Sequence, residues 1–263
     1  MPTDKVPTEE VSADSVVITW RGTVMTITLN RPDSLNSLTK PVIADILTAL
    51  EKARDSADAV VLTGGDRAFC SGADLRVQAV TEQAIGVDLV AQLVRTISDL
   101  PVPVIAAVSG AVVGVGCSLA LICDYIVCSD SAYMMLPFNR IGLMPDGGAT
   151  TLVAASAGRH RALRMALTGE KVPAAQCYSW GLVSEVAGEN YGVRAQRIAE
   201  QWAAGSRNAL AHTRAAINAA SLHQLDAALG RETAGQRALL DSQDFAEGVQ
   251  AFHEKRPPRF NSQ

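Results

Sequence analysis

One carboxylate stands in a stretch of the chain that otherwise carries little charge. Within residues 131–157, Arg140 and Asp146 are the only charged residues. A carboxyl group in apolar surroundings has a raised pKa, so Asp146 could act as a base toward a carbon acid. The same side chain could instead cap the helix that we expect to begin at Ala149. Spacing alone leaves both roles open and favours the cap slightly.

Two glycine-rich turns could present backbone N–H groups to a ligand. They are Ser71-Gly72-Ala73 and Gly114-Val115-Gly116. Glycine lets another backbone come close, and the start of a helix offers free N–H groups and the positive end of its dipole. Two such turns facing each other could form an oxyanion hole. The alternative is that each is an ordinary strand-to-helix turn, with Asp74 capping the helix after the first.

The composition argues against several classes of function. The 263 residues include 23 Lys and Arg against 27 Asp and Glu, and this net charge of −4 argues against general nucleic-acid binding. The five cysteines and four histidines show no metal-ligand spacing, so we expect reduced thiols and no metal site. The N-terminus is polar and lacks the features of a signal peptide. We therefore expect a cytoplasmic protein.

An uncharged run at residues 100–123 is long enough to raise the question of a membrane span. Pro101 and Pro103 disfavour a helix at its start, and several glycines and serines interrupt the rest. We expect a buried strand at Val104–Val108, a glycine-rich turn and a buried helix at Gly114–Ile122. The chain is then not expected to enter a membrane.

Strands and helices alternate through the first 190 or so residues, and helices fill the rest. This alternation is typical of an α/β fold with mostly parallel strands. We expect a core over residues 1–192 and a helical region over 193–263. Strands are expected at 16–20, 23–29, 59–63, 104–108, 125–129 and 182–186, and helices at 38–50, 82–100, 114–122, 149–158, 161–169 and 173–180. Residues 67–75 and 131–148 are expected to be loops.

Several motifs in a fixed order resemble the crotonase superfamily, the enoyl-CoA hydratase/isomerase family. The resemblance covers nearly the whole chain. The motifs are Thr28-Leu-Asn-Arg-Pro32, Leu35-Asn36, Ala68-Phe-Cys-Ser-Gly-Ala-Asp-Leu75, Pro103-Val-Ile-Ala-Ala107, Gly110, Gly114-Val-Gly116, Cys123-Asp124, Gly142-Leu-Met-Pro145, Gly147-Gly148 and Trp180-Gly-Leu-Val183.

The resemblance implies a spiral of ββα repeats followed by a C-terminal helical trimerisation region, hence a homotrimer or homohexamer. It implies an acyl-CoA substrate, with coenzyme A as part of the substrate and no separate cofactor. The two oxyanion amides of the family fall on Ser71 and Val115. The segments that would line the coenzyme A site contribute Arg31, Ser34, Leu35, Ser71, Gly72, Ala73, Asp74 and Leu75.

The chain departs from the family's hydratases at both catalytic glutamates. Those positions hold Ser118 and Phe138. What remains is Asp146, at the position where some enoyl-CoA isomerases, including the phenylacetate-pathway type, carry a single acid. The resemblance therefore implies a Δ3,Δ2-enoyl-CoA isomerase in fatty acid metabolism. With the resemblance counted, the catalytic role of Asp146 moves ahead of the capping role.

Three alternatives stay open from the sequence. The first is an enoyl-CoA hydratase, which is a lyase, with atypical residues. The second is an enzyme resembling the aryl-CoA dehalogenases, with Asp146 as a nucleophile. The third is a non-catalytic acyl-CoA binding protein that keeps the pocket. Acyl length is not defined, although residues 82–100 and the segment near Met134 and Met135 are expected to shape the acyl pocket.

Overall fold

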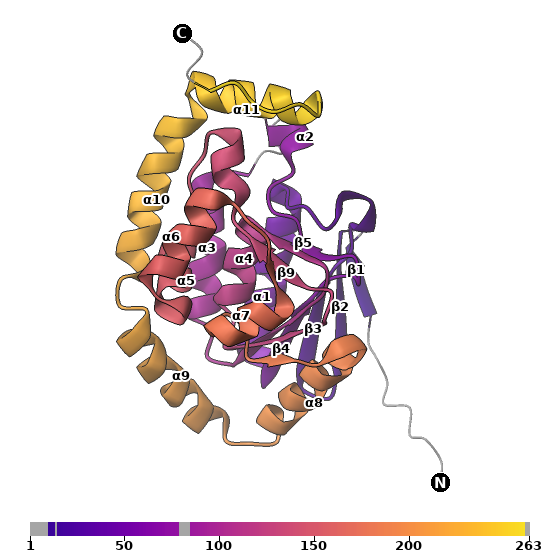
Figure 1. Cartoon of the computed structure of the whole chain (residues 1–263). Helices are drawn as coiled ribbons and strands as arrows, with labels where there is room; N and C mark the ends of the chain where they lie inside the picture. The colour runs from indigo at the N-terminus through magenta and orange to yellow at the C-terminus, as the bar shows by residue number, and fades with distance from the viewer. Residues whose placement is uncertain (1–9, 14, 79–84, 261–263) are drawn as a thin grey trace.

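Two sheets organise the fold in a computed structural model, which describes residues 10–13, 15–78 and 85–260 (Figure 1). The larger sheet has the strand order β1-β2-β3-β4-β6-β8-β11, and the smaller has the order β10-β9-β7-β5. The strands of the larger sheet are β1 (Glu10–Ala13), β2 (Val16–Arg21), β3 (Val24–Leu29), β4 (Ala59–Thr63), β6 (Val104–Val108), β8 (Tyr125–Cys128) and β11 (Glu185–Val186). Those of the smaller sheet are β5 (Ala68–Cys70), β7 (Ala111–Val113), β9 (Tyr133–Met135) and β10 (Val172–Pro173).

Successive units of the chain add one strand to each sheet and then a helix. β4 and β5 precede α2 (Leu75–Gln78) and α3 (Val87–Ser98), β6 and β7 precede α4 (Val115–Leu121), and β8 and β9 precede α5 (Ala149–Ala157). Each new strand pairs in parallel with its counterpart from the unit before. The chain therefore advances as a spiral of ββα units, as the resemblance implied.

The apolar runs explain the core. β6 is buried at every position, because layers cover both faces of a parallel sheet. The expected hairpin forms from β2 and β3, and Gly22 supplies the positive φ of its turn. Helix α1 (Lys40–Ser56) has Pro41 in its first turn and buries its apolar stripe, including Ile43, Ile46 and Leu50.

The structure corrects several expected boundaries. The segments expected as loops or a turn contain the short strands β5, β7 and β9, and the 3-10 helix η2 (Pro137–Ile141). Three-residue strands leave too little alternation to detect, and their partners are distant in sequence. Helix α3 begins at Val87, while the expected start at Glu82 lies outside the described residues. β11 covers two residues instead of five.

Helices make up most of the C-terminal half. Those after α5 are α6 (Arg159–Thr168), α7 (Ala174–Trp180), the 3-10 helix η3 (Gly188–Asn190), α8 (Tyr191–Ala203), α9 (Arg207–Ser221), α10 (Leu225–Leu240) and α11 (Gln243–His253). Of these, α9 and α10 lie along the left side of the molecule in Figure 1, away from β1 and β2. Ala195, Ile198 and Ala199 of α8 belong to a second apolar cluster on the larger sheet. The boundary expected after residue 192 falls in the first turn of this helix.

The uncharged run forms β6, β7 and α4, and all of α4 is buried. Among the helices that the structure describes, none combines the length and apolar character that crossing a bilayer requires.

Candidate active site

A cavity of about 590 Å³ lies where the two predicted turns, α3, η2 and the last two helices meet. It brings together most of the predicted site residues: Ser34, Leu35, Ser71, Gly72, Ala73, Asp74, Leu75, Val115, Phe138 and Asp146. Val87, Val90 and Met135 line it too, as expected for the acyl pocket. Arg31 and Ser118 are not among its lining residues.

Asp146 is a buried carboxylate of the cavity, with 7% of its surface exposed. Its Oδ2 accepts a hydrogen bond of 2.9 Å from Nε2 of Gln236. Its Oδ1 has no hydrogen-bond partner among the residues that the structure describes. Burial raises the pKa of Asp146 to about 7, and the hydrogen bond from Gln236 opposes part of this rise. A buried acid with one free oxygen suits proton transfer to or from a ligand.

The alternative role of Asp146, as a cap of α5, is not found, because Glu232 of α10 binds the start of α5 instead. Glu232 accepts hydrogen bonds from the N–H groups of Gly148 at 2.6 Å and Thr150 at 2.9 Å, and from the Thr150 hydroxyl at 2.5 Å. The Asp146 side chain makes no hydrogen bond to the start of α5. The acid is therefore free of a helix-end role.

Ser118 supports the loop that carries Asp146. Its hydroxyl donates a hydrogen bond of 2.7 Å to the backbone carbonyl of Asp146. Gly147 has a φ of +64°, and a Cβ there would lie 3.0 Å from both Cβ and Oγ of Ser118. The loop thus packs beside Ser118, which is 0% exposed, so a longer side chain at position 118 would have to displace its neighbours.

The amide of Ser71 is not available as an oxyanion donor, because its N–H already donates to the Leu35 carbonyl at 3.0 Å. The backbone N–H of Leu38 donates to the Gly72 carbonyl at 2.8 Å, and the Leu38 carbonyl accepts from the Asp74 N–H at 2.9 Å. Successive N–H groups alternate in direction along an extended segment, so the N–H of Ala73 faces away from Leu38.

The N–H groups of Ala73 and Val115 have no acceptor within the described ranges 10–13, 15–78 and 85–260. Both residues line the cavity. Gly72 and Gly114 let their backbones approach, since a Cβ on Gly72 would lie 2.9 Å from the Val113 carbonyl and 3.6 Å from the Val115 nitrogen. Within the described residues, Ala73 and Val115, and not Ser71, therefore offer unpaired backbone N–H groups at the cavity.

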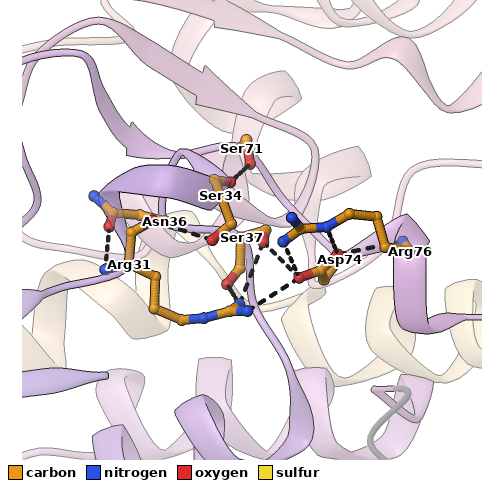
Figure 2. Close-up of polar contacts among 7 residues, drawn as sticks. All are labelled: Arg31, Ser34, Asn36, Ser37, Ser71, Asp74 and Arg76. Atoms are coloured by element: carbon orange, nitrogen blue, oxygen red, sulfur yellow. Dashed lines mark hydrogen bonds and ion pairs between the residues drawn. The ribbon is translucent and has the colours of Figure 1, made fainter. Parts of the chain in front are cut away.

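A network of charged and polar side chains lies on the side of the cavity that we call its mouth, where the lining residue Arg76 has a side chain that is 57% exposed. Figure 2 shows the contacts of this network. Asp74 accepts hydrogen bonds from Arg76 at 2.8 Å, Ser37 at 3.0 Å and Arg31 at 3.2 Å. The hydrogen bond from Arg76 is the main reason that the pKa of Asp74 lies well below its usual range. Asp74 also accepts from the Arg76 backbone N–H at 3.2 Å, as a cap of α2 would. The guanidinium groups of Arg31 and Arg76 thus add positive charge near the mouth.

The enoyl-CoA hydratase/isomerase family model matches residues 19–263. The chain belongs to this family. It is 39% identical over 242 residues to a probable enoyl-CoA hydratase of Rhodobacter capsulatus, covering 89% of this chain and 93% of that protein. It is 38% identical over 247 residues to the 1,2-epoxyphenylacetyl-CoA isomerase of Escherichia coli K12, covering 90% and 94%.

A solved enoyl-CoA hydratase from Mycobacterium avium subsp. paratuberculosis matches the fold with a TM-score of 0.87 and 44% identity. The match covers 94% of this chain and 99% of that one. The predicted crotonase-type fold is confirmed, and so is membership in a family of enzymes that act on CoA thioesters. The names of the relatives include both hydratase and isomerase, so they do not decide the reaction.

Sequence analysis missed the contribution of the C-terminal helices to the enoyl-CoA hydratase/isomerase site. Gln236 and Leu240 of α10 and Phe252 of α11 line the cavity. Phe252 is 53% exposed, so it covers the cavity only in part. Their spacing in sequence is that of ordinary helical residues, and no local signal separates them from a packing or solvent face.

Proposed function

We propose that this enzyme is a Δ3,Δ2-enoyl-CoA isomerase that uses Asp146 as its single acid and base. The observation that carries the proposal is the free Oδ1 of a buried carboxylate in an apolar cavity. The other carboxylates that line the cavity differ in setting, because Asp74 is paired with two arginines and Asp33 is exposed.

The proposed reaction needs one proton carrier. Asp146 removes a proton from C2 of a 3-enoyl-CoA and returns it to C4, so the double bond moves from C3=C4 to C2=C3. In the dienolate between these steps, negative charge gathers on the thioester oxygen. The N–H groups of Ala73 and Val115 would stabilise that oxygen. Losing one donor of this kind typically costs about 2.7–4 kcal/mol of transition-state stabilisation.

Ser118 and Phe138 support an isomerase over a hydratase. Hydratases of the family hold and activate water with two glutamates, whereas these positions carry a hydroxyl and an apolar ring. The Ser118 hydroxyl is engaged with the Asp146 carbonyl, and Phe138 is buried beside the cavity. Neither side chain can act as the general acid or base that water addition requires.

The test of the proposed function is a panel of 3-enoyl- and 2-enoyl-CoAs of several chain lengths, with products identified by mass and absorbance. The proposal predicts that 3-enoyl-CoAs give 2-enoyl-CoAs of unchanged mass. Conversion of 2-enoyl-CoAs to products heavier by one water would instead support a hydratase. Tight acyl-CoA binding without turnover of either series would support a binding protein.

Restoring a glutamate at position 118 is not expected to create a hydratase. In Ser118→Glu the longer side chain meets the Asp146–Gly147 loop. We expect isomerase activity to fall at least tenfold, which corresponds to a rise of roughly 1.4 kcal/mol or more in the activation free energy, and we expect no hydratase activity to appear. Ser118→Ala is the matched control, since it loses one hydrogen bond of about 1 kcal/mol and activity should fall about fivefold. Turnover of 2-enoyl-CoA to a hydroxyacyl product by Ser118→Glu would contradict this account.

The pH dependence of the reaction should report Asp146. The free enzyme needs the carboxylate form, so kcat/KM for a 3-enoyl-CoA should rise with pH and reach half its plateau near the Asp146 pKa of about 7. The contribution of Asp146 to the free energy of unfolding changes with pH in the opposite direction. Because the native state holds this proton more tightly than the unfolded chain, its contribution to stability is full below about pH 4 and is lost as pH rises through about 7.

Urea unfolding from pH 4 to 8, together with a kcat/KM profile, measures both trends. In Asp146→Asn, the part of the pH dependence of stability that comes from Asp146 should disappear, because an amide does not titrate. A rate profile that is flat between pH 5 and 8 would contradict the assignment of Asp146 as the base.

A further inference from the structure

Helix α10 reaches the loop of Asp146 with two buried polar side chains that lie one turn apart. Glu232 and Gln236 are 1% and 2% exposed. Glu232 binds the N–H groups of Gly148 and Thr150, on the C-terminal side of Asp146. Gln236 contacts Asp146 itself. The two contacts differ in kind, because only Gln236 touches the proposed acid.

The Gln236 amide is oriented by contacts at both ends. Its Oε1 accepts the N–H of Met144 at 3.2 Å, and its Nε2 donates to Oδ2 of Asp146 at 2.9 Å. A backbone N–H can only donate, so the Met144 contact requires the oxygen of the amide on that side. The NH₂ group must then face Asp146, where it occupies Oδ2 and leaves Oδ1 without a partner among the described residues.

We propose that Gln236 is a positioning residue, which aims the Asp146 carboxylate at the substrate and favours its ionised form. This inference rests on the proposed function of Asp146. A neutral donor on Oδ2 stabilises the carboxylate more than the protonated acid, while burial works in the other direction. Gln236 thus keeps a buried acid able to release its proton near neutral pH.

Few charged groups compete for this role. Glu232 is the charged neighbour that acts on Asp146, and its carboxylate is held by the start of α5. Arg140 from η2 also lines the cavity, but its guanidinium donates to the Gly169 carbonyl at 2.9 Å. From α4, the contact is the neutral hydroxyl of Ser118. Gln236 is therefore the hydrogen-bond donor to the Asp146 carboxylate within the described residues.

The test is the titration of Asp146 in the full-length protein, read from its carboxyl ¹³C chemical shift and, separately, from the pH profile of kcat/KM. In Gln236→Leu the midpoint should rise by about one to two pH units, the equivalent of one lost hydrogen bond to a charged group. Activity at pH 7 should fall about tenfold or more. The NMR titration needs no turnover, so it tests Gln236 even if the isomerase assay fails.

Gln236→Glu gives a second test if the leucine variant does not fold. It keeps the size of the side chain and an acceptor for Met144, but it places a second carboxyl group against Asp146. The two groups should share a proton, so the midpoint should again rise. Arg237→Gln is the matched control, because it removes an exposed ion pair with Asp88 from the same helix without touching Asp146. Its titration should match the wild type.

A double variant separates positioning from simple loosening of the fold. In an Asp146→Asn background, Gln236→Leu should cause no further loss of activity, because the carboxylate that it serves is gone. An unchanged Asp146 midpoint in Gln236→Leu and Gln236→Glu would overturn the proposal. So would a loss of activity that follows a lower Tm while the midpoint stays at the wild-type value.

Discussion

Replacing Asp146 with Asn should lower kcat for a 3-enoyl-CoA by about 10²–10⁴-fold, the usual contribution of a positioned acid–base group. An amide has nearly the same shape, but it cannot accept the C2 proton and return it at C4. The fold should survive, because among the described residues the side chain hydrogen-bonds to Gln236 alone and caps no helix. Steady-state kinetics with 3-enoyl-CoA measures the loss.

Binding and stability controls make the result specific. Asp146→Asn should bind acyl-CoA with little change, since the mouth network and the amides of Ala73 and Val115 remain in place. Its Tm at pH 8 should equal or exceed that of the wild type, because the variant no longer buries an ionised group. Unchanged isomerase activity would refute the assignment. A covalent aryl adduct on Asp146, found by mass spectrometry after incubation with an aryl-CoA halide, would support the nucleophilic alternative.

Replacing Arg214 with Leu should lower the free energy of unfolding by about 3–5 kcal/mol, the cost of removing one partner from a largely buried ion pair, in which the side chains of Asp124 and Arg214 are 17% and 6% exposed. Its Nε lies 2.6 and 2.7 Å from the two carboxylate oxygens of Asp124. Its other nitrogens donate to the carbonyls of Ile97, Ser98 and Leu100, at 2.6–2.7 Å. The variant would leave the partly buried Asp124 carboxylate without its arginine, leave the carbonyls at the end of α3 without their donors, and release α9 from α3.

Urea denaturation measures this loss, and an exposed ion pair provides the comparison. Arg95 contacts Asp226 at 2.7 Å, with side chains 45% and 84% exposed. Arg95→Leu should therefore cost less than about 1 kcal/mol. Adding Asp124→Asn to Arg214→Leu should recover part of the stability, since the unpaired charge disappears. Equal losses for Arg214→Leu and Arg95→Leu would contradict this view of the Arg214 contacts.

The longer strands of the fold could be predicted from the sequence, whereas the shortest ones could not. Apolar runs such as Val104–Val108 and residues 59–62 predict buried strands, because four or five consecutive apolar residues bounded by turn residues favour little else. The strand Tyr133–Met135 could not be found this way. Its pairing with Ala111–Val113 and Val172–Pro173 comes from the spiral as a whole.

Site residues could be predicted where the local sequence marks them. They could not be predicted where their role depends on contacts with distant parts of the chain. Asp146 stands out as a lone carboxylate in an apolar segment. The choice of Ala73 over Ser71 as a donor depends on pairing with Leu38, which the local sequence does not reveal. Gln236 reaches Asp146 across 90 residues of sequence, and nothing around it marks a functional position.

The fate of the C2 hydrogen tests most directly the claim that Asp146 alone carries the proton. A 3-enoyl-CoA with deuterium at C2 is turned over once in ordinary water, and the product is analysed by NMR and mass spectrometry. Because the acid is buried, part of the deuterium should appear at C4 of the 2-enoyl-CoA, and the Asp146→Asn variant should give no such transfer. A wild-type product without deuterium at C4 would contradict the account. So would a hydrated product in place of the 2-enoyl-CoA.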